Sequence, residues 1–194
     1  MLEHPVGPAV FQGVGKAVGM KTVGSVVGAV VLVGGLLVAG TEGTLNPGDP
    51  FPAWSLVDHA GAPVTSRDLA GKTYLLWYYP KALTSGCTAE GCALRDSFAE
   101  FTRLGVAVVG VSFDNPEKNA EFVKEHGFPF RLLSDRDKSL AVAVGAADSD
   151  KRLFARRISY LVGPNGTVLK AYAQVDPSRH ARQVLDDIAL LRQK

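Results

Sequence analysis

The chain has 194 residues, two of them cysteine, and its 21 lysine and arginine residues against 19 acidic residues leave a net charge of +2. This near-neutral balance gives no electrostatic case for binding nucleic acid, and two cysteines do not make a disulfide framework. A folded body of about 150 residues buries around 70% of its unfolded surface, so its stability requires no disulfide.

The N-terminal part of the chain differs from the rest in composition. Residues 22–41 contain no charged side chain and consist mostly of valine, glycine, leucine and alanine. A helix of that length can cross a hydrocarbon core of about 30 Å. Lys16 and Lys21 precede this segment and Glu42 follows it. The positive-inside tendency then predicts that residues 1–21 form a cytoplasmic tail and that the remainder of the chain is exported.

Three interpretations of residues 22–41 stay open. The favoured one is an uncleaved transmembrane anchor, which attaches the protein to the membrane. The second is a cleaved signal peptide, with translation starting at Met20, although Val38-Ala39-Gly40 fits a small-x-small cleavage site only loosely. The third is a glycine- and valine-rich tail on a soluble protein that stays in the cytoplasm.

The next segments predict a linker and the start of a folded domain. Residues 42–53 are rich in proline and glycine, which predicts a linker to a domain over residues 54–194. Residues 54–58 and 62–64 flank a glycine-containing turn and are predicted to form a short hairpin. Residues 73–79 are almost continuously apolar or aromatic, as expected of a central strand that is buried on both faces.

The rest of the chain alternates helical and extended patterns. Apolar residues at helical spacing follow Cys87 as far as Leu104, and Ser178 is predicted to cap the last helix. Further helices are predicted at 116–126 and around 140–144, with strands at 106–111, 130–133, 158–162 and 167–173. This order predicts an α/β domain in which helices flank a central mixed β-sheet.

Both cysteines lie in one short segment, residues 80–92. Cys87 stands where the extended run gives way to the helical pattern, so unpaired backbone N–H groups and the helix dipole favour its thiolate form. Cys92 lies five residues further along the same predicted helix, a rise of about 7.5 Å. Because a disulfide needs Cα atoms within roughly 7 Å, the pair can close only if the helix unwinds locally. A pair that closes only after unwinding is better suited to a redox cycle than to a permanent disulfide. The alternative for Cys92 is a structural role, because a cysteine in an apolar stripe is more often an unreactive residue of the core.

The motif around Cys87 resembles a known active site. Pro80, Thr84 and Cys87 match the Pro-x-x-x-Thr-x-x-Cys pattern of the peroxiredoxins, and Cys92 matches the second cysteine of the bacterioferritin-comigratory-protein (PrxQ-like) branch. The similarity continues at residues 94–96, 110–112, 129–130, 133–135 and 157–162, and covers roughly residues 46–194. Relatives commonly have proline where this chain has Ser85. This difference is expected to affect the stiffness of the loop more than the chemistry of the cysteine.

The resemblance implies a thioredoxin-like fold and a thiol-dependent peroxidase that reduces hydrogen peroxide and organic hydroperoxides. Cys87 would be the peroxidatic cysteine, which becomes a sulfenic acid, and Cys92 the resolving cysteine, which then forms the disulfide. Thioredoxin or a similar dithiol would restore the two thiols.

The remaining site residues follow from the same resemblance. Pro80 would shield the site, and the hydroxyl of Thr84 would hydrogen-bond the thiolate or the peroxide. Arg157 would bind both of these groups with its fork of donors, with Arg156 as the fallback.

No cofactor, metal or nucleic acid is expected, and the protein is expected to be a monomer. The four histidines show no ligand spacing and are expected at the surface. They are His4, His59, His126 and His180.

Two other functions compete with this interpretation. A membrane-tethered thiol–disulfide oxidoreductase of the same superfamily would have Cys-x-x-Cys and a proline before the later strand. This chain instead has four residues between its cysteines, and Arg157-Ile158-Ser159 at the later strand. A non-catalytic interaction module is the other alternative, and the presence of Thr84, Cys87 and Arg157 argues against it.

Overall fold

The computed structural model describes residues 43–193. The predicted tail over residues 1–21 and the predicted anchor or signal segment over residues 22–41 lie outside these residues. Within residues 43–193, no helix is both long and apolar enough to cross a membrane.

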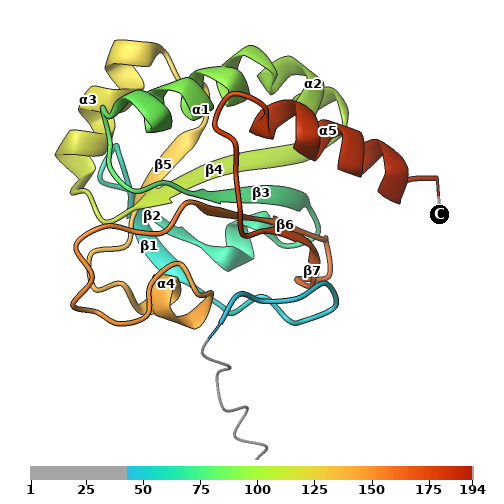
Figure 1. Cartoon of the computed structure of the whole chain (residues 1–194), viewed down its shortest axis with the longest axis horizontal. Coiled ribbons are helices and arrows are strands. Elements are labelled where there is room, and N and C mark those ends of the chain that lie inside the picture. Colours follow the sequence, from blue (N-terminus) through green and yellow to red (C-terminus); the bar gives the residue numbers. More distant parts are fainter. Residues whose placement is uncertain (1–42, 194) are drawn as a thin grey trace, which may run out of the picture. The chain divides into compact units, whose positions relative to one another are not determined.

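Seven strands form one mixed sheet in the order β2-β1-β5-β4-β3-β6-β7 (Figure 1). The three strands at its centre, β3, β4 and β5, are parallel, whereas β6 runs antiparallel to β3, and β1 runs antiparallel to β5. The strands are β1 (Ser55–Asp58), β2 (Pro63–Thr65), β3 (Thr73–Tyr78), β4 (Val106–Ser112), β5 (Arg131–Ser134), β6 (Ile158–Val162) and β7 (Val168–Tyr172). The predicted α/β class with a central mixed sheet is therefore confirmed.

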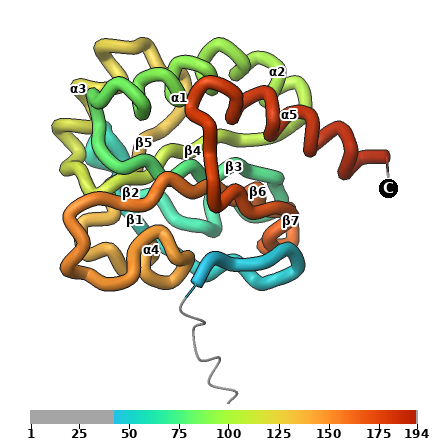
Figure 2. The backbone as a smooth tube through the Cα atoms, in the orientation of Figure 1, coloured from blue at the N-terminus to red at the C-terminus, as the bar shows by residue number. Residues whose placement is uncertain are grey.

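Helices cover both faces of this sheet (Figure 2). Helices α1 (Ser85–Asp96), α2 (Phe98–Arg103), α3 (Pro116–His126) and α5 (His180–Leu191) lie on one face, and α4 (Ser139–Ala143) lies on the other. The central strand β3 faces both layers, and Leu75, Leu76, Trp77 and Tyr78 have no exposed surface. This burial explains why its sequence is apolar without alternation.

Two helix boundaries differ from those predicted. The helical pattern from Cys87 to Leu104 is divided at Ser97, where ψ is 1°, so α1 ends and α2 begins there. Helix α1 also starts earlier than expected, at Ser85, and this places Cys87 third in the helix. The prediction that Ser178 caps α5 is wrong: Arg179 occupies that position, while the Ser178 hydroxyl donates to Asp176 Oδ1 at 2.7 Å.

The segment predicted to be a linker lies against the sheet. Phe51 is 9% exposed, and its ring centroid is 5.5 Å from that of Tyr160 on β6. The backbone N–H of Gly48 donates to the carbonyl of Val168 on β7 at 2.8 Å. Residues 43–53 therefore contribute packing and hydrogen bonds to the fold.

Candidate active site

The loop between β3 and α1 holds the first turn of α1 in place. The backbone N–H of Ala82 donates to Asp114 Oδ2 at 2.8 Å, which ties the loop to the residues after β4. Leu83 has a φ of 61°, in the left-handed region that side chains other than glycine seldom adopt. Thr84 then takes the N-cap position of α1. These contacts of the loop fix where α1 begins, and they thereby place Cys87 in its first turn.

Cys87 and Arg157 are brought together by strand pairing. Arg157 immediately precedes β6, and β6 pairs with β3 so that Ile158 lies opposite Tyr78 at the end where the active-site loop begins. Arg157 Nη2 is 3.5 Å from Cys87 Sγ, although 70 residues separate them. The expected contact between the cysteine and an arginine from far along the chain is present. The thiol itself is buried, with no exposed surface on Cys87.

Arg156, the fallback for this role, contacts a different part of the fold. Its guanidinium donates to the carbonyl of Gly145 and to Asp148 Oδ2, both at 3.2 Å. Its side chain is 46% exposed, against 20% for that of Arg157. The choice of Arg157 over Arg156 therefore agrees with the geometry.

The other predicted site residues occupy the loop and the helix. Pro80 is half-buried and follows Tyr79 at the end of the β3 region. The exposed hydroxyl of Thr84 donates to the carbonyl of Lys81 at 2.9 Å, so it is engaged within the loop. Cys92 is half-buried, and both cysteines are free thiols while α1 is helical through both positions.

A buried carboxyl group that the sequence reasoning missed lies beside this pair. Glu90 has no exposed side-chain surface, and its Oε2 accepts a hydrogen bond from Arg157 Nη1. Burial raises the pKa of Glu90 to about 7, against the lowering effect of the Arg157 charge. The signal for this residue was its spacing, because a residue three positions after Cys87 lies on the same face of a helix.

His180, expected at the surface, is fully buried at the start of α5. Its Nε2 forms a hydrogen bond with Ser159 Oγ at 2.9 Å and lies 3.9 Å from Glu90 Oε1. Burial lowers the pKa of His180 to about 4, so this side chain is neutral at ordinary pH. The surface prediction failed because α5 packs on α1, a long-range contact that histidine spacing does not reveal.

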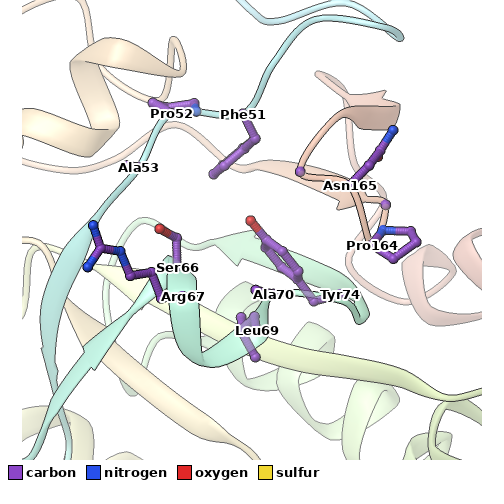
Figure 3. A pocket seen from close by; sticks show the side chains of 12 residues that line it. Phe51, Pro52, Ala53, Ser66, Arg67, Leu69, Ala70, Tyr74, Pro164 and Asn165 are labelled. Carbon is purple, nitrogen blue, oxygen red and sulfur yellow. The ribbon is translucent and has the colours of Figure 1, made fainter.

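A cavity of about 290 Å³ lies elsewhere, between the 3-10 helix Ser66–Leu69 and the β6–β7 turn (Figure 3). Phe51, Tyr74 and Asn165 are among its lining residues, and Arg67 is the charged side chain that lines it. None of the predicted site residues lines this cavity. Its lining includes no cysteine and no residue of α1.

The comparisons with known proteins agree with this geometry. The model of the AhpC/TSA family matches residues 47–171. The chain is 35% identical over 148 residues to Peroxiredoxin Bcp of Escherichia coli K12, covering 73% of this chain and 94% of that one. It is 34% identical over 142 residues to the chloroplastic Peroxiredoxin Q of Sedum lineare, covering 73% and 76% of the two chains.

Solved structures show the same relationship. The peroxidoxin BcpB of Mycobacterium tuberculosis matches with a TM-score of 0.71 and 28% identity, over 76% of this chain and 99% of that one. A cysteine-to-serine mutant of PrxQ from Xylella fastidiosa matches with a TM-score of 0.71 and 26% identity, over 76% and 98% of the two chains. The fold is therefore thioredoxin-like, and the chain belongs to the AhpC/TSA family, in the branch of the Bcp and PrxQ proteins.

Proposed function

We propose that this protein is a thiol-dependent peroxidase and that Cys87 is its nucleophile. The observation that carries the proposal is the 3.5 Å contact between Arg157 Nη2 and Cys87 Sγ in the first turn of α1. A cation and a helix N-terminus both favour the thiolate, which is the nucleophilic form of cysteine. The relatives named peroxiredoxins support the same chemistry.

The reaction begins with attack of the Cys87 thiolate on one oxygen of the peroxide. A sulfur–oxygen bond forms, the O–O bond breaks, and the other oxygen leaves as hydroxide or alkoxide, which takes up a proton to give water or an alcohol. Arg157 presents donors to the thiolate and to the charge that develops on the oxygens. The product is a sulfenic acid on Cys87.

Cys92 then resolves this sulfenic acid. Its thiolate attacks the sulfenic sulfur, a disulfide forms, and hydroxide leaves and becomes water after it takes up a proton. Cys92 is five positions along α1, so α1 must unwind before the two sulfur atoms can meet. A thioredoxin-like dithiol completes the cycle by thiol–disulfide exchange.

The two alternatives receive less support. The relatives described above are named peroxiredoxins, and their names give no support to a membrane-tethered thiol–disulfide oxidoreductase. A non-catalytic module would have no need of a guanidinium held against a buried sulfur.

The location of the protein stays a proposal that rests on residues 22–41. We infer an extracytoplasmic catalytic domain, anchored by this segment or released after its cleavage. The reductant would then be a dithiol protein on that side of the membrane. Cell fractionation together with sequencing of the mature N-terminus tests this: a cytoplasmic protein that retains residues 1–41 would contradict it.

The test of the activity is a thiol titration with hydrogen peroxide. One equivalent of peroxide should convert both thiols of the wild-type chain into one disulfide. Cys87→Ser should consume no peroxide rapidly, because the nucleophile is gone. Cys92→Ser should consume one equivalent and accumulate the sulfenic acid, detected by mass spectrometry after trapping with dimedone. Normal turnover of Cys87→Ser would contradict the proposed nucleophile, and normal cycling of Cys92→Ser would contradict the resolving role.

A further inference from the structure

Glu90 is a buried carboxyl group in which one of the two oxygens accepts a hydrogen bond. Its Oε2 accepts from Arg157 Nη1, and its side chain has no exposed surface. Its Oε1 has no hydrogen-bond partner among residues 43–193. A carboxylate in this position loses its water shell and recovers only part of that free energy from one partner. The ionised side chain therefore destabilises the folded form of α1.

The groups around Glu90 do not complete its solvation. The indole N–H of Trp77 on β3 lies near enough to the carboxylate to oppose the rise in the pKa of Glu90, but it forms no hydrogen bond of good geometry within the described part of the chain. His180 on α5 lies 3.9 Å from Oε1 and is neutral, because burial lowers its pKa to about 4. Arg157 is thus the cation in contact with this carboxylate.

Further ionisable groups surround the contacts of Glu90. Asp187 on α5 pairs with Lys170 on β7 at 2.6 Å, and the ring of Tyr172 on β7 lies 5.1 Å from that of His180. Of the titratable and charged groups on the elements that pack against Glu90, Arg157 and His180 lie within 4 Å of its carboxylate. Cys87, Asp187, Tyr172 and Lys170 contact those two residues or each other. Arg182 and Asp186 on α5 are exposed and pair with each other.

Glu90 also lies between the two cysteines in sequence, on the helix that must unwind. When this part of α1 leaves its folded position, the carboxylate moves from the protein interior into water and regains its solvation. Unwinding therefore relieves the unfavourable burial that the folded helix imposes.

We propose that the buried carboxylate of Glu90 promotes the unwinding of α1 and thereby speeds formation of the Cys87–Cys92 disulfide. The second part of this statement rests on the proposed function, whereas the first concerns the helix alone. The role differs from that of an ion-pair clasp, in which the contact between Glu90 and Arg157 would hold α1 closed.

The sign of the pH dependence follows from the difference between the two states. Burial raises the pKa of Glu90 from its ordinary value of 4.5 to about 7 in the folded helix. Between these values the folded helix binds more protons than the unwound one, so unwinding becomes more favourable as the pH rises. The expected increase in the unwinding equilibrium between pH 6 and pH 8 is about tenfold.

The test compares amide hydrogen exchange of α1 in the fully reduced, full-length chain and in its Glu90→Gln variant. The readout is the protection factor, the exchange rate relative to that of the unfolded chain at the same pH. In the unsubstituted chain, protection of α1 should fall about tenfold from pH 6 to pH 8. Glu90→Gln should raise the protection at pH 8 and remove this decrease. Glu121→Gln, an exposed substitution on α3, is the matched control and should behave as the unsubstituted chain does.

Two results would overturn the proposal. Lower protection of α1 in Glu90→Gln at pH 8 would show that Glu90 acts as a clasp. A flat pH series in the unsubstituted chain would show that its ionisation does not affect the helix, and this measurement decides the matter even if the variant does not fold. The exchange experiment uses no peroxide, so it can succeed or fail independently of the thiol titration that tests the peroxidase.

Discussion

The two halves of helix α1 are held in different ways. In the first half, Cys87 and Glu90 have no exposed surface, and Arg157 from the start of β6 contacts both of them. In the second half, Cys92 is half-buried, Leu94 is buried in the apolar core, and Arg95 donates to the carbonyl of His126 at 2.7 Å. Contacts with Arg157, in the segment that leads into β6, thus set the geometry of one end, and packing with surface hydrogen bonds holds the other.

This difference corresponds to the two steps of the proposed reaction. Attack on peroxide needs the thiolate and the guanidinium in one geometry, and Arg157, the residue before β6, supplies the guanidinium. Disulfide formation needs the helix to open, and partly exposed hydrogen bonds contribute little resistance to opening. On the proposal above, the buried carboxylate of Glu90 nevertheless favours opening of the first half, because Arg157 is its one hydrogen-bond partner within residues 43–193.

Among substitutions that test the difference between the two halves of α1, the largest effect is expected from removing the charged contact of the first half. Arg157→Ala takes away the donor that lies 3.5 Å from Cys87 Sγ. We expect the second-order rate constant for oxidation of Cys87 by hydrogen peroxide to fall about 100- to 1,000-fold, as for other donors that stabilise developing charge. Stopped-flow measurement of thiol loss gives this rate.

The matched control for that substitution is its neighbour. Arg156→Ala removes an equal charge, but this guanidinium contacts Gly145 and Asp148 instead of the sulfur. Because an exposed charge contributes little free energy, the rate of Cys87 oxidation in this variant should stay within about threefold of the wild-type value. Equal losses in the two variants would mean that net charge, rather than the contact with Cys87, accounts for the effect.

The junction between the two halves should be the next most sensitive point. A Cβ at Gly91 would lie 2.6 Å from Phe128 Cζ and 3.1 Å from the Trp77 ring, and Phe128 is itself packed against Phe122. Overpacking costs about 1–3 kcal/mol, whereas helix propensity favours alanine by about 1 kcal/mol. Gly91→Ala should therefore lower the free energy of unfolding by up to about 2 kcal/mol in urea denaturation.

A double substitution distinguishes this clash from other causes. Phe128→Leu shortens the side chain that the new methyl group would meet. The loss caused by Gly91→Ala should be smaller in that background, a coupling that a double-mutant cycle measures. Independent, additive losses would contradict the assignment of the effect to Phe128.

Much of the fold was predictable because local patterns agree with the tertiary structure. The buried strand at 73–79 was readable from continuous apolar residues, and α3 from the proline at its first turn. Cys87 was found from its place at a strand-to-helix junction, and Arg157 from the family resemblance. Each of these features depends on a few consecutive residues or on a motif.

The parts that were missed depend on contacts between distant segments. Residues 43–53 are rich in proline and glycine, yet Phe51 finds its partner in Tyr160, more than a hundred residues away. His180 is buried because α5 packs on α1, and Ser178 loses the cap position because Asp176 binds its hydroxyl. Composition and spacing within one segment do not contain these pairings.

The smallest effect should come from the surface contacts of the second half. Arg95 bonds the carbonyl of His126 and pairs with Asp96 at 2.8 Å, and its side chain is 34% exposed. Because such contacts exchange with water, Arg95→Ala should reduce the free energy of unfolding by about 0.5–1 kcal/mol. Asp96→Asn keeps the bond to His126 and should change stability by less than about 0.5 kcal/mol in the same urea titration. A decrease in the free energy of unfolding of more than about 2 kcal/mol for Arg95→Ala would show that polar contacts contribute strongly to the second half of α1. That result would contradict the proposed difference between the two halves.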